Sequence, residues 1–309
     1  MVDAFRHAAP SPETTGQIRA TLADRNNLLV SKAAAIAGDQ GLIRLTPDLL
    51  SAFTRFLKDA VKTDPQCWAK TAIIKALRQF GHSDADVFLS GITHIQKEPV
   101  WGGSTDTAAT LRGICALALV DTTLPTQTIL THLVNLTADP EKIVRMESVR
   151  AIAALGRDES ELLLRMKLLA GDAEPEVSGH CMSGLLELSA PGAVSFVEKY
   201  LTAGEDLRFE AIAALGTAPQ VEAVAALIRC WERSRETAAL RALGLSKHAP
   251  AIDFLMDVAE TGPSMGASMA IESLAGSRFR NEISDRLKAA LDRREDHDLM
   301  KVFQRLFVS

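Results

Sequence analysis

The side chains best suited to binding chemistry are concentrated between residues 68 and 106. They combine indole rings, imidazoles, a carboxamide and two carboxylates, which together offer stacking surface, titratable groups and hydrogen-bond partners. The set is Trp68, His82, His94, Gln96, Glu98, Trp101 and Asp106. Tryptophan and well-placed polar groups are enriched where proteins bind their partners. If the chain has one localised binding site, we expect it here, on one edge of the molecule.

The segment 94–113 (HIQKEPVWGGSTDTAATLRG) carries most of these side chains and inserts a Trp-Gly-Gly turn before a helix. Such a turn loses much conformational entropy on folding. This entropy loss is expected to be offset either by packing of the Trp101 indole on a neighbouring repeat or by display of the loop to a partner, and we favour packing. Asp106, just before an Ala-rich helix, is expected to cap that helix.

Catalytic and metal-binding patterns are not evident. The seven histidines are scattered, and the closest pair, His82 and His94, is expected on different elements. There is no G-x-S-x-G elbow, no Walker loop and no G-x-G-x-x-G turn, and no strand pattern stands out. We therefore predict that the chain is not an enzyme and holds neither a metal nor a cofactor.

A repeated phrase predicts the elements that position these residues. VRMESVRAIAALG (144–156) returns as LRFEAIAALG (207–216) and LRALG (240–244), with looser copies elsewhere. The expected helix ends are Gly38, Gly81, Val120, Gly156, Ser189, Gly216, Gly244 and Gly276. The intervals between successive positions each suit two helices and two turns, so an all-α solenoid of about eight helical hairpins is predicted.

Local signals support the hairpins. Proline follows a capping residue at expected helix starts, as in Thr46-Pro47 and Asp139-Pro140. Glycine at the other end is expected to supply the left-handed residue that closes each helix. The four cysteines are widely spaced within helical patterns and are expected to be buried free thiols; they are Cys67, Cys115, Cys181 and Cys230.

The unit of a capped proline start, a Val-Arg or Leu-Arg pair and an Ala-rich helix ending in Leu-Gly resembles the HEAT-like repeats of bilin-lyase-type and other bacterial HEAT proteins. The resemblance implies a right-handed α-α superhelix that recognises proteins. It also implies that the arginine of the pair bonds to turn residues, here Arg112, Arg145, Arg208 and Arg241. Some HEAT-repeat hydroxylases hold two irons through His-Glu pairs, but this sequence has no His-Glu dipeptide.

Charge bears on the partner. The formal net charge is −5 and the isoelectric point about 5.8, whereas proteins that bind nucleic acid backbones usually carry a basic excess. We therefore do not expect nucleic acid as the partner, although Trp68, Trp101 and Asp106 match the residue types used by HEAT-like DNA-repair proteins. We expect a non-catalytic scaffold or adaptor that binds an unidentified protein through its concave surface. The alternatives are a nucleic-acid binder and a lyase-like accessory protein.

Three regions are expected along the chain. Residues 1–16 form a flexible N-terminal segment, residues 17–280 the repeat array, and residues 281–309 helices that cap its end. The apolar cluster within 298–308 is alternatively a dimer or partner surface, so we expect a monomer or a weak dimer. No apolar run approaches the roughly 18 residues of a membrane span. With no secretory signal in view, a cytoplasmic protein is expected.

Overall fold

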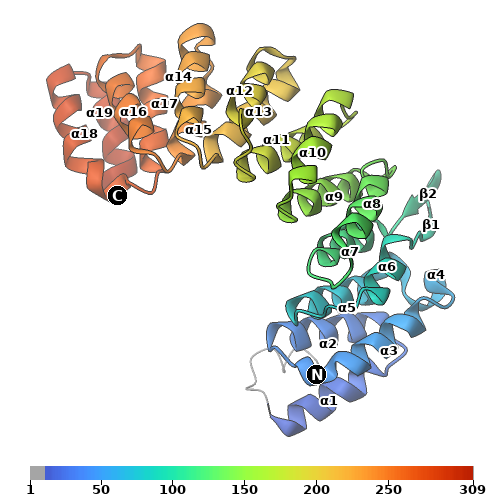
Figure 1. Cartoon of the computed structure of the whole chain (residues 1–309). Coiled ribbons are helices and arrows are strands. Elements are labelled where there is room, and N and C mark those ends of the chain that lie inside the picture. The colour runs from blue at the N-terminus through green and yellow to red at the C-terminus, as the bar shows by residue number, and fades with distance from the viewer. Residues whose placement is uncertain (1–10, 309) are drawn as a thin grey trace. The chain divides into compact units, whose positions relative to one another are not determined.

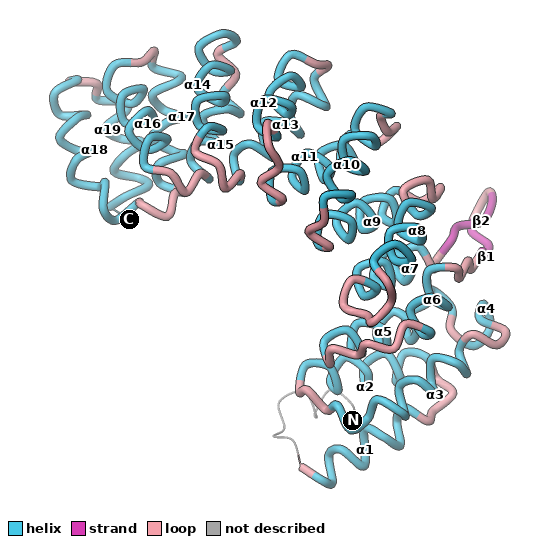
Figure 2. Tube along the Cα trace, in the orientation of Figure 1, coloured by secondary structure: helices cyan, strands magenta, loops and turns pink. Residues whose placement is uncertain are grey.

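The computed structural model describes residues 11–308, which fold into stacked helices and one small β-hairpin (Figures 1 and 2). This confirms the prediction of an all-α fold built from helical hairpins. The chain divides into two compact units, the first ending at Leu155 and the second beginning at Gly156.

The first unit contains α1 (Pro12–Leu22), α2 (Asn27–Asp39), α3 (Thr46–Phe56), α4 (Ala60–Thr63), α5 (Trp68–Gln79), α6 (Asp86–Ile92), β1 (Lys97–Val100), β2 (Gly103–Asp106), α7 (Ala109–Leu119), α8 (Thr126–Leu136) and α9 (Lys142–Ala154). The second contains α10 (Asp158–Ala170), α11 (Pro175–Glu187), α12 (Ala193–Glu198), α13 (Glu205–Thr217), α14 (Glu222–Ser234), α15 (Thr237–Leu245), α16 (Ala249–Thr261), α17 (Ser264–Ala275), α18 (Arg280–Arg294) and α19 (His297–Phe303). Short 3-10 turns lie at Ile43–Leu45, Pro65–Cys67 and Lys199–Thr202, and a π turn at Gln304–Val308.

The second helix of each hairpin packs on the second helix of the next. In the first unit this layer is α2, α5, α7 and α9, and in the second it is α11, α13, α15 and α17. We call these the layer helices. The expected helix ends fall within two residues of the observed ends of all eight. The predicted number of hairpins is therefore confirmed, with α18 and α19 following them.

The chain is helical near both ends of the described residues. Of the segment 1–16, residues 1–10 lie outside the described part of the chain, and α1 begins at Pro12. Its first turn is capped by Ser11, whose side chain accepts from the N–H of Thr14. Near the other end, Leu299 and Phe303 of α19 are buried, and α19 packs on α17 and α18.

The glycines that end the repeats have two different roles. Gly81 and Gly156 adopt the expected left-handed conformation, with φ of 67° and 62°. At Gly276 that expectation is wrong, because its φ is −82°. It is also wrong for Gly38, Gly216 and Gly244, because they lie inside α2, α13 and α15. A Cβ at Gly244 would come within 2.7 Å of the Ser273 carbonyl oxygen in α17. These glycines let consecutive layer helices approach closely.

The other structural expectations are largely confirmed. Arg145 donates to the carbonyls of Asp139 and Pro140 in the turn before α9, and the Nε of Arg208 lies 2.7 Å from Glu236 Oε2. Arg241 differs, because its Nε contacts the sulfur of Met269. All four cysteines are buried free thiols. Burial raises the pKa of Cys67 to about 12, which leaves that thiol protonated and unreactive.

Candidate functional site

A β-hairpin occupies the segment where no strand was expected. β1 and β2 are antiparallel and join at a two-residue turn, Trp101-Gly102, whose Gly102 has a φ of 84°. Figure 1 shows the hairpin projecting from the helices between α6 and α7. The insertion is therefore an ordered arm on the first unit.

Trp101 stands at the tip of this arm. Its relative exposure is 103%, so the indole contacts no neighbouring repeat. The expectation that it packs is wrong, because the strands carry the turn beyond the reach of the helices. A fully exposed tryptophan leaves its whole apolar surface in water, which is unfavourable for the isolated chain. The alternative of display to a partner fits this placement.

The base of the hairpin is held by the buried carboxylate of Glu98. Its oxygens accept from the Thr107 hydroxyl at 2.6 Å, from Gln96 Nε2 at 2.7 Å and from the Gln66 backbone N–H at 2.7 Å. Burial by itself raises the pKa of Glu98, but these hydrogen bonds together lower it below its ordinary value. Glu98 thus joins both strands to the loop before α5.

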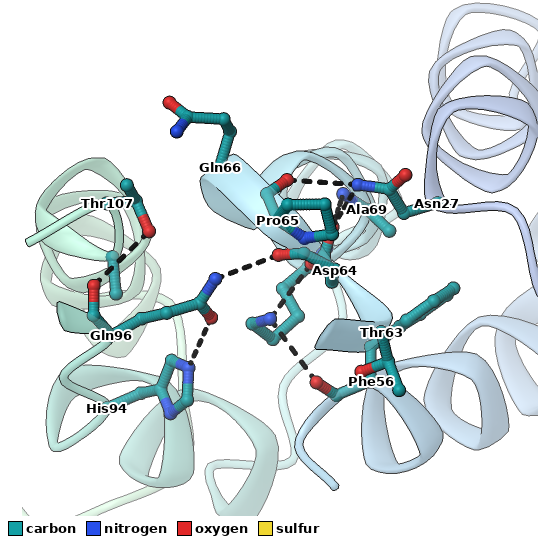
Figure 3. Close-up of polar contacts among 12 residues, drawn as sticks. Asn27, Phe56, Thr63, Asp64, Pro65, Gln66, Ala69, His94, Gln96 and Thr107 are labelled. Atoms are coloured by element: carbon teal, nitrogen blue, oxygen red, sulfur yellow. Dashed lines mark hydrogen bonds and ion pairs between the residues drawn. The ribbon is translucent and has the colours of Figure 1, made fainter. Parts of the chain in front are cut away.

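That loop is organised by a second carboxylate, Asp64, which is fully buried with Lys70. Asp64 accepts from the backbone N–H groups of Ala69 and Lys70 at the start of α5 and from the amide of Asn27 in α2. Its Oδ2 lies 2.9 Å from Lys70 Nζ. Gln96 reaches across from the hairpin and donates to the Asp64 carbonyl oxygen at 2.8 Å (Figure 3). Hairpin, loop and helix therefore form one hydrogen-bonded assembly.

Asp106, at the end of β2, completes the anchoring. Its Oδ2 lies 2.7 Å from the buried guanidinium of Arg112 in α7, which also pairs with Asp139 at 2.9 Å. Its Oδ1 accepts from the N–H groups of Gln96 and Ala108, so it organises the turn before α7 rather than acting as the residue that caps it. Burial opposes ionisation of Asp106, but these partners lower its pKa. Asp106 therefore ties the end of β2 to α7.

The two histidines lie apart from each other. His94 Nε2 is 3.2 Å from Gln96 Oε1, and since the Gln96 amide nitrogen donates elsewhere, the imidazole donates here. Burial, with the charges of Lys70 and Arg112, lowers the pKa of His94. His82 follows the far end of α5, roughly 18 Å along the helix from its first residue. His82 therefore lies away from the hairpin base, and its imidazole packs edge-on against Phe88 of α6.

An open groove of about 660 Å³ runs beside the hairpin base. We call it the α5 groove. Trp68, the first residue of α5, lines it and is 47% exposed. The remaining walls come from α2, α5, the end of β2 and the start of α7; they include Ser31, Lys32, Ala35, Asp39, Gln66, Thr71, Ala72, Lys75, Gln79, Thr105, Asp106, Thr107 and Thr110.

Of the residues expected at a site, only Trp68 and Asp106 line the groove, while Gln96, Glu98 and His94 support the hairpin behind it. The groove residues of α2 and α5 were not predicted from the sequence. Trp68, Thr71, Lys75 and Gln79 are spaced by three or four residues, so they share the helix face opposite the buried Ile73 and Leu77. That spacing could have indicated that these side chains form one surface beside Trp68.

Metal-ion sites and membrane-spanning helices are the other features that could indicate a function. No group of three or more His, Cys, Asp or Glu side chains is placed to hold a metal ion within residues 11–308. Over the same residues, no helix combines the length and apolar character needed to cross a bilayer.

Comparison with known proteins gives structural neighbours only. No family model matches the chain, and no curated protein matches it. Human deoxyhypusine hydroxylase is 16% identical with a TM-score of 0.29, covering 78% of this chain and 85% of its own. Two engineered proteins are each 15% identical, with TM-scores of 0.39 and 0.20; they cover 99% and 94% of this chain and 92% and 94% of their own.

The first of these neighbours corrects one expectation. We predicted from the absence of catalytic and metal-binding patterns that the chain is not an enzyme, and this is contradicted by an enzyme among the similar structures. At 16% identity and a TM-score of 0.29, the likeness transfers no activity or residue role to this chain.

Proposed function

We propose that this chain is a HEAT-like recognition protein that binds a partner polypeptide in the α5 groove. The observation that carries the proposal is the half-exposed indole of Trp68, which lines a groove of about 660 Å³ next to a rigidly anchored hairpin. Grooves of this size can hold several side chains of a ligand. A tryptophan in such a groove is the kind of anchor that dominates binding energy.

Preorganisation supports the proposal. The loop before Trp68 is fixed because Gln66 donates to Glu98 and because Asp64 holds the first amides of α5. Gln66 and Cys67 are both held with positive φ, at 63° and 56°, which sets the direction in which α5 begins. A surface whose shape is already set loses little entropy on binding. The buried network therefore serves recognition by fixing the position of the indole.

The groove is also chemically mixed. Lys32, Lys75 and Asp39 bring charges of both signs, and several threonines supply hydroxyl groups. A polypeptide presents both apolar and hydrogen-bonding groups to such a lining, whereas a nucleic acid backbone requires a cationic one.

With four buried free thiols, the protein fits a reducing cytoplasmic environment, and we propose that it acts there as a monomer or weak dimer.

The proposal is tested by selecting phage-displayed random 12-residue peptides on the full chain and measuring the affinity of enriched peptides by fluorescence anisotropy. Trp68→Ala should weaken binding at least 30-fold, the loss of about 2 kcal/mol expected for a hot-spot tryptophan. Phe209→Ala is the matched control, because Phe209 is an aromatic residue of the same 47% exposure on a layer helix of the second unit. If enriched peptides bind both variants alike, the α5 groove is not the recognition surface.

A further inference from the structure

The two edges of the hairpin differ in what they offer to another strand. Lys97 pairs with Asp106, Glu98 with Thr105 and Pro99 with Ser104. One step beyond, Thr107 N–H donates to the Gln96 carbonyl at 3.0 Å, so that pair is hydrogen-bonded. In antiparallel strands bonded and non-bonded pairs alternate. The bonded pairs are thus Gln96 with Thr107 and Glu98 with Thr105.

It follows that Ser104 and Asp106 direct their backbone groups away from β1, toward the outer edge of β2. On the outer edge of β1 the corresponding residues are Lys97 and Pro99. Pro99 has no N–H, and proline at an edge prevents further strand pairing. β2 has no proline; Ser104 is exposed, whereas Asp106, at the base of the strand, is buried. Within the described residues, β2 therefore presents the open edge of this two-stranded sheet.

The open edge lies beside the α5 groove. Thr105, Asp106 and Thr107 line that groove, and no β1 residue does. β1 and the residues before it instead border a separate pocket of about 260 Å³, with Ile95, Gln96 and Lys97. A chain lying along the outer edge of β2 would therefore enter the groove that contains Trp68.

From this juxtaposition we propose that the partner binds as an extended strand that pairs with β2 and places an apolar side chain against Trp68. This inference rests on the proposed function and specifies the conformation of its ligand. Backbone pairing would supply affinity that depends little on the ligand's sequence, while Trp68 selects one side chain. The β2 edge is short, so the paired stretch is about four residues. Ser104 and Asp106, two residues apart, fix the spacing of the bonds at roughly 6.8 Å.

The test uses the peptides enriched on the full chain, resynthesised with a single N-methyl group at each successive position. N-methylation removes one backbone donor and leaves the protein unchanged. Pairing with β2 predicts a loss of at least tenfold in affinity at every second position across the paired stretch, and less than threefold at the positions between. A flat profile, or one without a two-residue period, would overturn strand pairing.

A protein variant provides the complementary measurement. Ser104→Pro removes the outward N–H while leaving the bonds between β1 and β2, and it should weaken peptide binding at least tenfold. Ser104→Ala keeps that N–H and should change binding less than twofold. Thermal denaturation of both variants controls for loss of the hairpin, and the N-methyl scan decides the question if Ser104→Pro is unstable.

The two proposals fail in different ways. Peptides that depend on Trp68 but not on the Ser104 N–H, and that show no two-residue period, would leave the groove as the binding site and refute strand pairing. Peptides that are indifferent to Trp68→Ala would refute the proposed function itself, and strand pairing at this groove with it.

Discussion

Removal of the Asp64 carboxylate should destabilise the first unit more than any other single carboxylate change that we consider. Asp64 and Lys70 are both fully buried. In Asp64→Ala the Lys70 ammonium would keep only the Phe56 carbonyl oxygen, which its Nζ contacts at 3.3 Å. The N–H groups of Ala69 and Lys70 and the amide of Asn27 would lose an acceptor as well.

The expected magnitude follows from these losses. Removing one partner of a buried ion pair lowers the free energy of unfolding by about 3–5 kcal/mol, because the other charge stays buried without its partner. The unsatisfied amides at the start of α5 cost about 1 kcal/mol more. Since domains are stable by only about 5–15 kcal/mol, this change should remove a large fraction of the first unit's stability.

The measurement is urea denaturation followed by far-UV circular dichroism, with hydrogen exchange to read α2 and α5 separately. Asp48→Ala is the matched control, since Asp48 is an aspartate of the same unit with a more exposed ion pair. Its Oδ2 lies 3.1 Å from the Nε of Arg19, and the Arg19 side chain is half exposed. Its loss should cost less than about 1 kcal/mol. The double variant Asp64→Asn with Lys70→Met should recover part of the stability, because no buried charge remains.

Equal effects of Asp64→Ala and Asp48→Ala, both under about 1 kcal/mol, would refute this reasoning. They would mean that water reaches Lys70 in the variant at little cost. A double variant no more stable than Asp64→Asn alone would likewise show that the ammonium is not the source of the penalty.

Three further predictions concern the hairpin and the repeat glycines. Because the pKa of Glu98 is lowered in the folded protein, its stabilising contribution is complete above its ordinary pKa of about 4.3 and is lost as pH falls through the lower folded value; an acid titration of stability should be flatter in Glu98→Gln than in the native chain. Trp101→Ala should change the free energy of unfolding by less than about 0.5 kcal/mol in denaturant titration, since the side chain is fully exposed. Gly244→Ala should cost about 1–3 kcal/mol, whereas Gly16→Ala, whose added Cβ meets nothing within 4 Å in α1, should stabilise by about 0.5–1 kcal/mol; equal melting temperatures for the two would contradict the close approach of α15 and α17.

The sequence predicts the helices well because their signals are local. Apolar periodicity, proline starts and repeated helix ends all lie within single hairpins. The role of the repeat glycines was only partly predicted, because a close approach between two helices involves residues far apart in the chain. Gly244 and Ser273 are an example: nothing local to Gly244 indicates that a carbonyl from the next repeat lies against it.

The hairpin escaped prediction for a different reason. Its strands, KEPV and GSTD, contain proline, glycine and aspartate, which are all uncommon in strands. The strands are held by Glu98 and Asp106, which bond to Gln66 and Arg112, and the first of these pairs is separated by 32 residues in the chain. Trp68 and the insertion were correctly expected in one region, but no local pattern separates the residues that face the groove from those that support the hairpin.

The anchoring of the hairpin at its base has a consequence for how this chain can change in length. All of the described bonds that fix the hairpin to the helices involve residues before Val100 or after Gly103. The turn between them therefore makes none of the contacts that hold the hairpin in place. Doubling the length of a flexible loop costs only about 0.6 kcal/mol. Foreign segments, such as an epitope or a fluorescent-label tag, can therefore be grafted between Trp101 and Gly102 without shifting the register of any helix.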